Sequence, residues 1–205
     1  MNRQQIGLVR HGQTDWNALG RIQGQTDIPL NDIGRDQAMK LAARLLHEPY
    51  RFDAVISSGL QRAEETAAII ASHLAIPLLE PHAGLLERAF GLAEGTTLEE
   101  RTSRWGVDWK AQDVGQETDR AIRLRAVEAV NFIANQWPER NILIISHGSW
   151  LAQLFYTWFG EECTSHIGNL SFTVVERHEQ NWEALLLNCS RHMAETTFEV
   201  SQKVR

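Results

Sequence analysis

Short apolar runs alternate with amphipathic segments along most of this chain. The apolar runs at 6–9, 53–57 and 142–145 are bounded by polar residues and are too short for buried helices. Between them lie segments whose apolar residues recur with the period of a helix that buries one face. Strands that are apolar throughout are typical of a mostly parallel sheet covered on both sides. The alternation therefore predicts an α/β fold.

Capping residues and periodicity place the remaining elements. Helices are expected after Asn31, from about Leu60, from the N-cap Thr118 to about Trp137, and from about Ser149 to Phe159. A short strand is expected at 76–79, and an antiparallel pair of strands at 171–176 and 182–187. The last sixteen or so residues carry weak patterning, and we assign them no role.

The composition suits one hydrophobic core. A length of 205 residues with 43% hydrophobic residues predicts a single domain over 1–205. Residues 84–117 differ from the rest because glycines break them into short segments. We expect them to form a small cap-like excursion over one end of the sheet.

Charge and cysteine content narrow the partners and the location. The net charge of −6 argues against nucleic acid as the main partner, although a local cluster of arginines can still bind a small phosphorylated substrate. Cys163 and Cys189 are too few for a disulfide framework or a metal cage. The chain enters its first strand without room for a signal peptide, and no apolar stretch approaches the roughly 20 residues of a membrane span. A cytoplasmic protein without membrane contact is expected, and its oligomeric state is left open.

Polar, chemically versatile residues follow three of the expected strands. Arg10, His11 and Gly12 follow the first strand, a Ser-Ser-Gly sequence at 57–59 follows the second, and His147 and Gly148 follow the run at 142–145. Ligands of doubly wound sheets bind outside the carboxyl ends of the strands. If these three strands are neighbours, their terminal residues meet in one pocket.

Arg62 lies in the first turn of an expected helix, where the helix dipole disfavours a cation and favours an anion. A positive side chain is better tolerated there if it meets an anion that the helix N-terminus already attracts. The alternatives are a solvated surface arginine, or one neutralised by Glu64 or Glu65. Arg62 is thus a candidate anion ligand.

Arg10 and His11 admit more than one interpretation. The guanidinium of Arg10 matches two phosphoryl oxygens, but it could instead pair with Asp27 or Asp32. His11 could be a core histidine bonded to a backbone carbonyl, or a metal ligand together with His147. No further ligand stands at a recognisable metal-site spacing, and an adjacent arginine opposes a cation. Nearby cations depress the pKa of a histidine, which leaves one nitrogen free to act as a nucleophile.

Several motifs occur together and in a recognisable order. They are R-H-G-Q-T-D-W-N, G-R-I-Q-G, S-S-G-L-Q-R-A-E-E-T-A, L-L-E-R-A-F-G-L-A-E-G and I-S-H-G. From about residue 6 to 188 the chain resembles the histidine phosphatase superfamily, also called the phosphoglycerate mutase-like family. The resemblance implies a three-layer α/β/α sandwich around a six-stranded, mainly parallel sheet. It also implies a histidine acid-type phosphatase, a phosphoric monoester hydrolase that uses no metal and no cofactor.

The same resemblance implies roles for individual residues. His11 matches the phosphorylated nucleophile, and Arg10, Arg62 and His147 match the residues that hold the transferring phosphoryl group, His147 in its protonated form. Glu87 matches the acid that protonates the leaving oxygen. Further phosphate or substrate contacts are implied for Asn17, Gln23, Gly24 and Gly148.

The acid role of Glu87 has alternatives. To donate a proton it must first be protonated, which a dry pocket wall such as Phe90 would favour. Glu87 could instead be a surface carboxylate paired with Arg88. Glu94 is its rival for the acid role, although the resemblance makes Glu94 the structural member of a Glu-Gly pair.

The excursion bears on the reaction type. Mutases of this family carry a longer insertion with paired arginines, whereas the stretch 95–116 has only Arg101, Arg104 and Lys110. Ala93 stands where the family commonly has Trp, which would open that edge of the cleft. A short cover should admit water, so we expect hydrolysis of a phosphomonoester. Phosphoglycerate mutase-type transfer and a non-catalytic phospholigand-binding module are the alternatives.

The excursion also holds two tryptophans whose role the sequence leaves open. Trp105 and Trp109 lie four residues apart and could form an aromatic wall over the cleft or the core of the excursion. Trp16 has the same two interpretations. The physiological substrate and the breadth of specificity are therefore not determined by the sequence.

Overall fold

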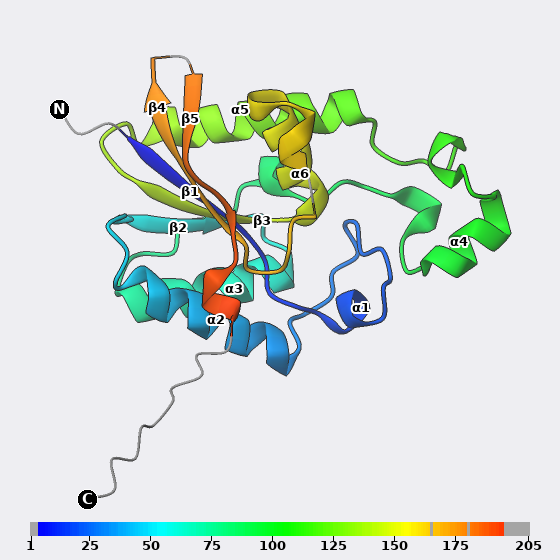
Figure 1. Ribbon diagram of the computed structural model, residues 1–205, viewed down its shortest axis with the longest axis horizontal. Coiled ribbons are helices and arrows are strands. Elements are labelled where there is room, and N and C mark those ends of the chain that lie inside the picture. The colour runs from blue at the N-terminus through cyan, green and yellow to red at the C-terminus, as the bar shows by residue number, and fades with distance from the viewer. Residues whose placement is uncertain (1–3, 165, 180, 195–205) are drawn as a thin grey trace, which may run out of the picture.

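The central sheet brings together strands from both ends of the chain. The computed structural model describes residues 4–164, 166–179 and 181–194 (Figure 1). The strands are β1 (Gln5–Arg10), β2 (Ala54–Ser57), β3 (Ile142–Ser146), β4 (Phe172–His178) and β5 (Asn181–Cys189). Their order is β2-β3-β1-β4-β5, with parallel pairing from β2 to β1 and antiparallel pairing on either side of β4. Only β4 therefore runs against the other four, which confirms a mainly parallel α/β sheet.

The strand count differs from the prediction. The described residues form five strands, so the expected six-stranded sheet is wrong in number. The segment 76–79 makes a single parallel bridge, between Leu78 and Val55. Pro77 accepts a hydrogen bond from the Val55 amide at 2.9 Å but has no amide hydrogen of its own to donate. Regular pairing does not extend along this edge of β2.

Four helices lie where capping and periodicity placed them: α2 (Asp32–Leu45), α3 (Gln61–Leu74), α5 (Asp119–Gln136) and α6 (Gly148–Phe159). Two short helices were not predicted, α1 (Asp15–Ala18) and α4 (Leu98–Trp105). The side chain of Asn31 accepts from the Gly34 amide at 2.9 Å, and Thr118 accepts from the Ala121 amide at 3.2 Å. These bonds satisfy amides that the first helical turn leaves free. No helix in the described part of the chain is long and apolar enough to cross a membrane.

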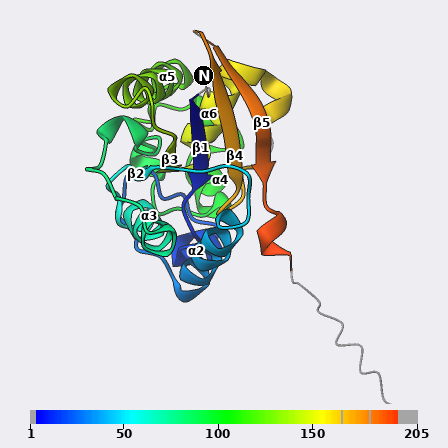
Figure 2. The same ribbon diagram turned by 90° about the vertical axis from the view of Figure 1, so that its left-hand side faces the viewer.

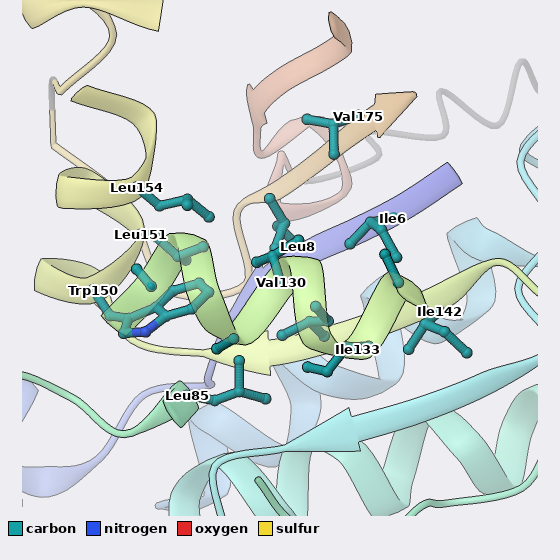
Figure 3. Packing of buried hydrophobic residues seen from close by; sticks show 14 of the residues in the cluster. Ile6, Leu8, Leu85, Val130, Ile133, Ile142, Trp150, Leu151, Leu154 and Val175 are labelled. Atoms are coloured by element: carbon teal, nitrogen blue, oxygen red, sulfur yellow. The ribbon is translucent and has the colours of Figure 1, made fainter. Parts of the chain in front are cut away.

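Alternate residues of the inner strands supply two separate cores. Ile142 and Ile144 of β3 face α5 and α6, whereas Leu143 and Ile145 face α2 and α3. Figure 2 shows the two helix pairs on opposite sides of the sheet. Figure 3 shows the first core, in which Trp150 of α6 packs near Leu85. Burial on both faces explains why the strands are apolar throughout.

The excursion forms a lobe beyond the carboxyl end of the parallel strands. It contains η1 (Ala83–Leu85), η2 (Gly91–Ala93), α4 and η3 (Trp109–Ala111). In Figure 1 it extends past the sheet on the same side as the loop that carries α1. Its own small core contains Ala93, Trp109 and Val114.

Ile144→Ala should lower the free energy of unfolding by about 2–5 kcal/mol, because the fully buried side chain leaves a cavity between the sheet and α5. Urea unfolding measures the change. Leu124→Ala is the matched control, since that side chain is 60% exposed, and it should change the free energy by less than about 0.5 kcal/mol. Equal losses in the two variants would contradict the assignment of this core.

Candidate active site

Segments far apart in the sequence line one pocket of about 340 Å³ at the edge where β1 and β3 end. The lining residues are Arg10, His11, Asn17, Arg21, Ile22, Gln23, Gly24, Arg62, Glu87, Phe90, Gly148, Ser149, Ala152, His166 and Ile167. Every site residue predicted from the sequence is among them except His147. That ring lies directly behind the lining, against His11.

Strand pairing brings the two histidines together. β3 lies between β1 and β2, which confirms that the three strands are neighbours. Arg10 is paired with Ser146, and the His11 amide donates to the Ser146 carbonyl at 3.0 Å. The next residues, His11 and His147, therefore leave the sheet side by side. Their ring centroids are 5.1 Å apart, with 57° between the ring planes.

The tautomer of His11 follows from its one backbone contact. Its Nδ1 lies 2.7 Å from the Gly12 carbonyl oxygen, which can only accept, so Nδ1 carries the hydrogen. Burial first, and then the charges of Arg62 and Arg10, hold the pKa of His11 well below its usual value. The ring is therefore neutral, and its Nε2 keeps a lone pair. His11 thus makes the backbone hydrogen bond expected of a core histidine, through Nδ1. Its Nε2, the nitrogen that could act as a nucleophile, is left free in the pocket.

His147 is fully buried and also neutral. Its Nε2 lies 2.7 Å from the Ser58 hydroxyl, and its Nδ1 has no hydrogen-bond partner among the described residues. Burial, Arg62, His11 and Arg10 lower its pKa well below the usual value. The protein's own groups thus do not support the expected protonated form of His147. A neighbouring anion would supply the opposite charge that a protonated ring requires.

Arg62 is buried, so the interpretation as a solvated surface arginine is wrong. Its guanidinium donates to the carbonyl oxygens of Gly24, at 2.7 Å, and Thr26, at 2.9 Å. Glu65 does not neutralise it, because that carboxylate pairs with Arg35 at 2.7 Å. Burial lowers the pKa of Arg62 to about 10, which leaves it charged at neutral pH.

Arg10 is likewise held by backbone oxygen. It donates to the Ile167 carbonyl at 2.6 Å, and its Nε has no partner among the described residues. The alternative ion pairs are not formed in the described structure: Asp27 accepts from Gln61 and Asp32 from Arg35. Buried cations that meet carbonyl dipoles instead of carboxylates keep donors available for an incoming anion.

Glu87 lies at the N-terminus of α6. Its carboxylate accepts from the amides of Arg88 at 2.8 Å, Trp150 at 3.0 Å and Ser149 at 3.1 Å. His147, the N-cap residue of α6, makes no side-chain cap, so Glu87 supplies that cap from a distant segment. The surface alternative is wrong, because the Arg88 side chain pairs with Asp119 at 2.5 Å and Glu87 is buried.

Glu94 is placed outside the pocket and fixes a loop. It accepts from the amides of Gln25, at 3.1 Å, and Thr26, at 3.0 Å. A Cβ on Gly24 would lie 2.0 Å from its Oε1, and Gly24 has a φ of +56°. This loop carries the carbonyls that bind Arg62. Glu94 thus acts on the arginine through the backbone.

The tryptophans of the excursion form its core. Trp109 is buried with Ala93 and Val114, and Trp105 packs against them. Neither ring lines the pocket, so the interpretation as an aromatic wall is wrong. Ala93 does not open the cleft, because it is fully buried in this cluster. Trp16 lies against Gly95 and also does not line the pocket.

The sequence analysis missed the wall formed by residues 166–169. His166 and Ile167 line the pocket, and the Asn169 amide group donates to the His11 carbonyl at 2.9 Å. These residues precede β4, which is antiparallel to β1, so the start of β4 lies where β1 ends. The expected antiparallel pair at the end of the chain was the signal that could have placed them. Arg21 was missed as well, although it stands inside a motif that carried the resemblance.

Comparison with known proteins identifies the family. The model of the histidine phosphatase superfamily (branch 1) matches residues 6–190. The chain belongs to the histidine phosphatase superfamily. Among the described residues, no group of three or more His, Cys, Asp or Glu side chains is placed so that it could hold a metal ion.

Relatives of this histidine phosphatase cover most of its length. The phosphatase PhoE of Bacillus subtilis is 33% identical, over 92% of this chain and 96% of its own. A protein of Arabidopsis thaliana named metal-independent phosphoserine phosphatase is 33% identical, over 87% of this chain and 78% of its own. The solved structure of Bacillus stearothermophilus YhfR superimposes with a TM-score of 0.84 and 27% identity, covering 93% of this chain and 100% of its own. Other relatives are named as phosphoglycerate mutases.

The two buried histidines should make stability depend on pH. Both are held neutral in the folded protein, whereas in the unfolded chain each gains a proton as the pH falls below about 6.5. The unfolded state then binds more protons, so the free energy of unfolding should decrease as the pH falls from about 6.5. Urea unfolding at a series of pH values measures this slope. His147→Asn should flatten it, with the exposed His47→Asn as the control, and an unchanged slope in His147→Asn would show that this ring is not held neutral.

Proposed function

We propose that this protein is a metal-independent phosphomonoesterase that hydrolyses a small phosphorylated metabolite through a phosphohistidine on His11. The observation that carries the proposal is the free Nε2 of a neutral His11, in a pocket with two guanidiniums that meet carbonyls instead of carboxylates. Such a pocket attracts a phosphoryl group and presents a nucleophile to it. A volume of about 340 Å³ suits a small substrate.

The reaction takes two steps. In the first, His11 Nε2 forms a bond to phosphorus, the bond from phosphorus to the ester oxygen breaks, and Glu87 gives its proton to the departing alcohol. In the second, a water oxygen attacks phosphorus, the bond to nitrogen breaks, and the Glu87 carboxylate takes a proton from the water. Arg10, Arg62 and a His147 that the phosphoryl charge keeps protonated hold the equatorial oxygens. Asn17, Gln23, Gly24 and Gly148 contribute further substrate contacts.

The cations of the excursion favour hydrolysis over mutase-type transfer. Arg101 is buried and donates to the Thr96 carbonyl at 2.5 Å, and Arg104 and Lys110 lie over the rings of Trp105 and Trp109. None of the three lines the pocket. Arg21, which does, is already bonded to Glu100 at 2.9 Å. A mutase has to hold its reaction partner in place while the phosphoryl group returns, and in the described excursion no arginine without an ion pair lines the pocket.

The partner we propose is a small phosphoester, not nucleic acid or a membrane. The relative from Arabidopsis named for phosphoserine supports a substrate of this size. Both cysteines are free, which suits the reduced cytoplasm as the setting.

The purified protein should release inorganic phosphate from p-nitrophenyl phosphate at mildly acidic to neutral pH in the presence of EDTA. A rapid quench into alkali should trap phosphate on the wild-type protein and none on His11→Ala, because phosphohistidine survives in base. Conversion of 3- to 2-phosphoglycerate without release of phosphate would favour the mutase instead. Binding of phosphoesters with no turnover on a broad panel would favour a binding module.

His147→Ala and Arg62→Ala should each reduce kcat by at least roughly 10², because each removes a group that stabilises the transferring phosphoryl charge. Steady-state kinetics with p-nitrophenyl phosphate measure the loss. Arg120→Ala is the control, since Arg120 is exposed on α5. A rate near that of the wild type in either site variant would remove that residue from the proposed mechanism.

A further inference from the structure

Arg125 of α5 joins both ends of the excursion. Its Nε and Nη2 donate to the two carboxylate oxygens of Glu117, at 3.0 and 2.7 Å. Its Nη1 donates to the carbonyls of Gly84, at 3.0 Å, and Leu86, at 2.8 Å. A further contact of 3.5 Å reaches the carbonyl of Glu87 itself. One guanidinium therefore contacts the residue that ends the excursion and the segment that begins it.

This contact matters because the segment before Glu87 has little regular structure. Apart from the short η1, its carbonyls must find donors in other elements. The Ser146 hydroxyl donates to Leu85 at 2.8 Å, and the Trp150 indole donates to Gly84 at 2.8 Å. These bonds come from the sheet and from α6, and Arg125 supplies the bonds from α5. The planar fork of an arginine can satisfy several acceptors in fixed directions, which an ammonium group cannot do.

We propose that Arg125 is a positioning residue for the general acid: it holds the backbone of 84–87 so that the Glu87 carboxylate stays at the N-terminus of α6 and faces the ester oxygen. The inference rests on the proposed function, in which Glu87 protonates the leaving alcohol. Arg125 does not line the pocket, so its contacts reach the site through the backbone of 84–87. Its charge also lowers the pKa of His147, and a substitution by Lys keeps that charge.

The chain offers a matched control two residues away. Arg123 lies on the same helix, donates to Gln153 at 2.6 Å and stacks on Tyr156 at 3.7 Å. It makes no hydrogen bond to 84–87 in the described structure, although it lies 3.6 Å from Asp119, which also pairs with Arg88. Arg125→Lys and Arg123→Lys both keep the positive charge and remove the guanidinium, but only Arg125→Lys removes hydrogen bonds to the backbone of 84–87.

The test compares two substrates of similar shape. The p-nitrophenolate ion is a weak base that leaves without much help from an acid, whereas the alcohol of benzyl phosphate needs a proton as the bond breaks. A displaced Glu87 should therefore slow benzyl phosphate selectively. The comparison uses kcat/KM, which covers only the step that forms the phosphohistidine, because the second step, in which Glu87 acts as a base, is the same for both substrates. We expect Arg125→Lys to lower kcat/KM for benzyl phosphate by roughly 10- to 100-fold, the scale for a small misplacement of a catalytic group. The loss for p-nitrophenyl phosphate should stay below about 3-fold, and Arg123→Lys should leave the ratio of the two rates unchanged.

A double-variant cycle with Glu87→Gln separates positioning from general structural damage. Once the acid is gone, Arg125→Lys should cause no further selective loss on benzyl phosphate. Equal losses on both substrates, no loss at all, or an undiminished selective loss in the Glu87→Gln background would overturn the inference.

Should Arg125→Lys fail to fold, judged by circular dichroism and thermal unfolding, Glu117→Gln takes its place. Glu117→Gln removes the anionic partner of Arg125 and should show the same selective loss on benzyl phosphate to a smaller extent. Equal losses on both substrates, relative to the wild type, would overturn the inference.

Failure of the proposed function would look different. A wild-type protein that hydrolyses neither substrate would contradict the phosphatase itself. A Glu87→Gln variant that slows both substrates equally would contradict the acid role of Glu87. The positioning role of Arg125 fails alone only if wild type and Glu87→Gln behave as expected and Arg125→Lys does not.

Discussion

The parallel pairing of β1 with β3 is the constraint on which the rest of the structure depends. Its register sets Arg10 beside Ser146, and one more backbone bond, from the His11 amide to the Ser146 carbonyl, continues that alignment past the end of the sheet. The rings of His11 and His147 can approach to 5.1 Å only because both strands end at the same level. A slip of one residue would turn the side chains of one strand to the opposite face. The two apolar cores oppose that slip, since every inner strand is buried on both sides.

The charges of the site are arranged in two layers. Arg10 and Arg62, nearest the pocket, are held by carbonyl oxygens. Of the two carboxylates, Glu94 lies one step further out, where it fixes the loop whose carbonyls bind Arg62. Glu87 lines the pocket, but its oxygens accept from the amides that begin α6 and not from the guanidiniums. A carboxylate bonded directly to these guanidiniums would compete with a phosphoryl group for the same donors. Holding them with neutral dipoles instead leaves their charge to an incoming anion, at the cost of burying cations.

That arrangement also explains the state of the two histidines. Burial and neighbouring arginines lower the pKa of both rings. This suits the nucleophile role that we propose for His11, because a nucleophile needs its lone pair. In the proposed mechanism His147 is a cation, so its proton has to come with the binding of the phosphoryl anion. The Ser58 hydroxyl, 2.7 Å from its Nε2, is a neutral partner that accepts either protonation state.

Local sequence patterns predicted most of the helices and strands. They failed where contacts between distant segments decide which residues pair and which surfaces are buried. The caps at Asn31 and Thr118 act over three residues, so the sequence shows them directly. Pro77 has no amide hydrogen and so limits pairing, yet the apolar run around it predicted a short strand where the structure forms only a single bridge. The roles of Trp105 and Trp109 depend on which surface the excursion buries, and no periodic pattern contains that information.

The sequence by itself determined the fold class, four of the six described helices and the residue types at the ends of the strands, because these depend on periodicity, capping and short motifs. It also indicated the residues that we propose for catalysis, since the motifs that carry them are contiguous. The tertiary structure alone decided which carboxylate faces the pocket, what holds the arginines, and that the 166–169 segment joins the site. Those outcomes depend on the order of strands in the sheet and on bonds between segments 36 or more residues apart, such as the bond from Arg62 to Thr26 and the amides of α6 that bind Glu87.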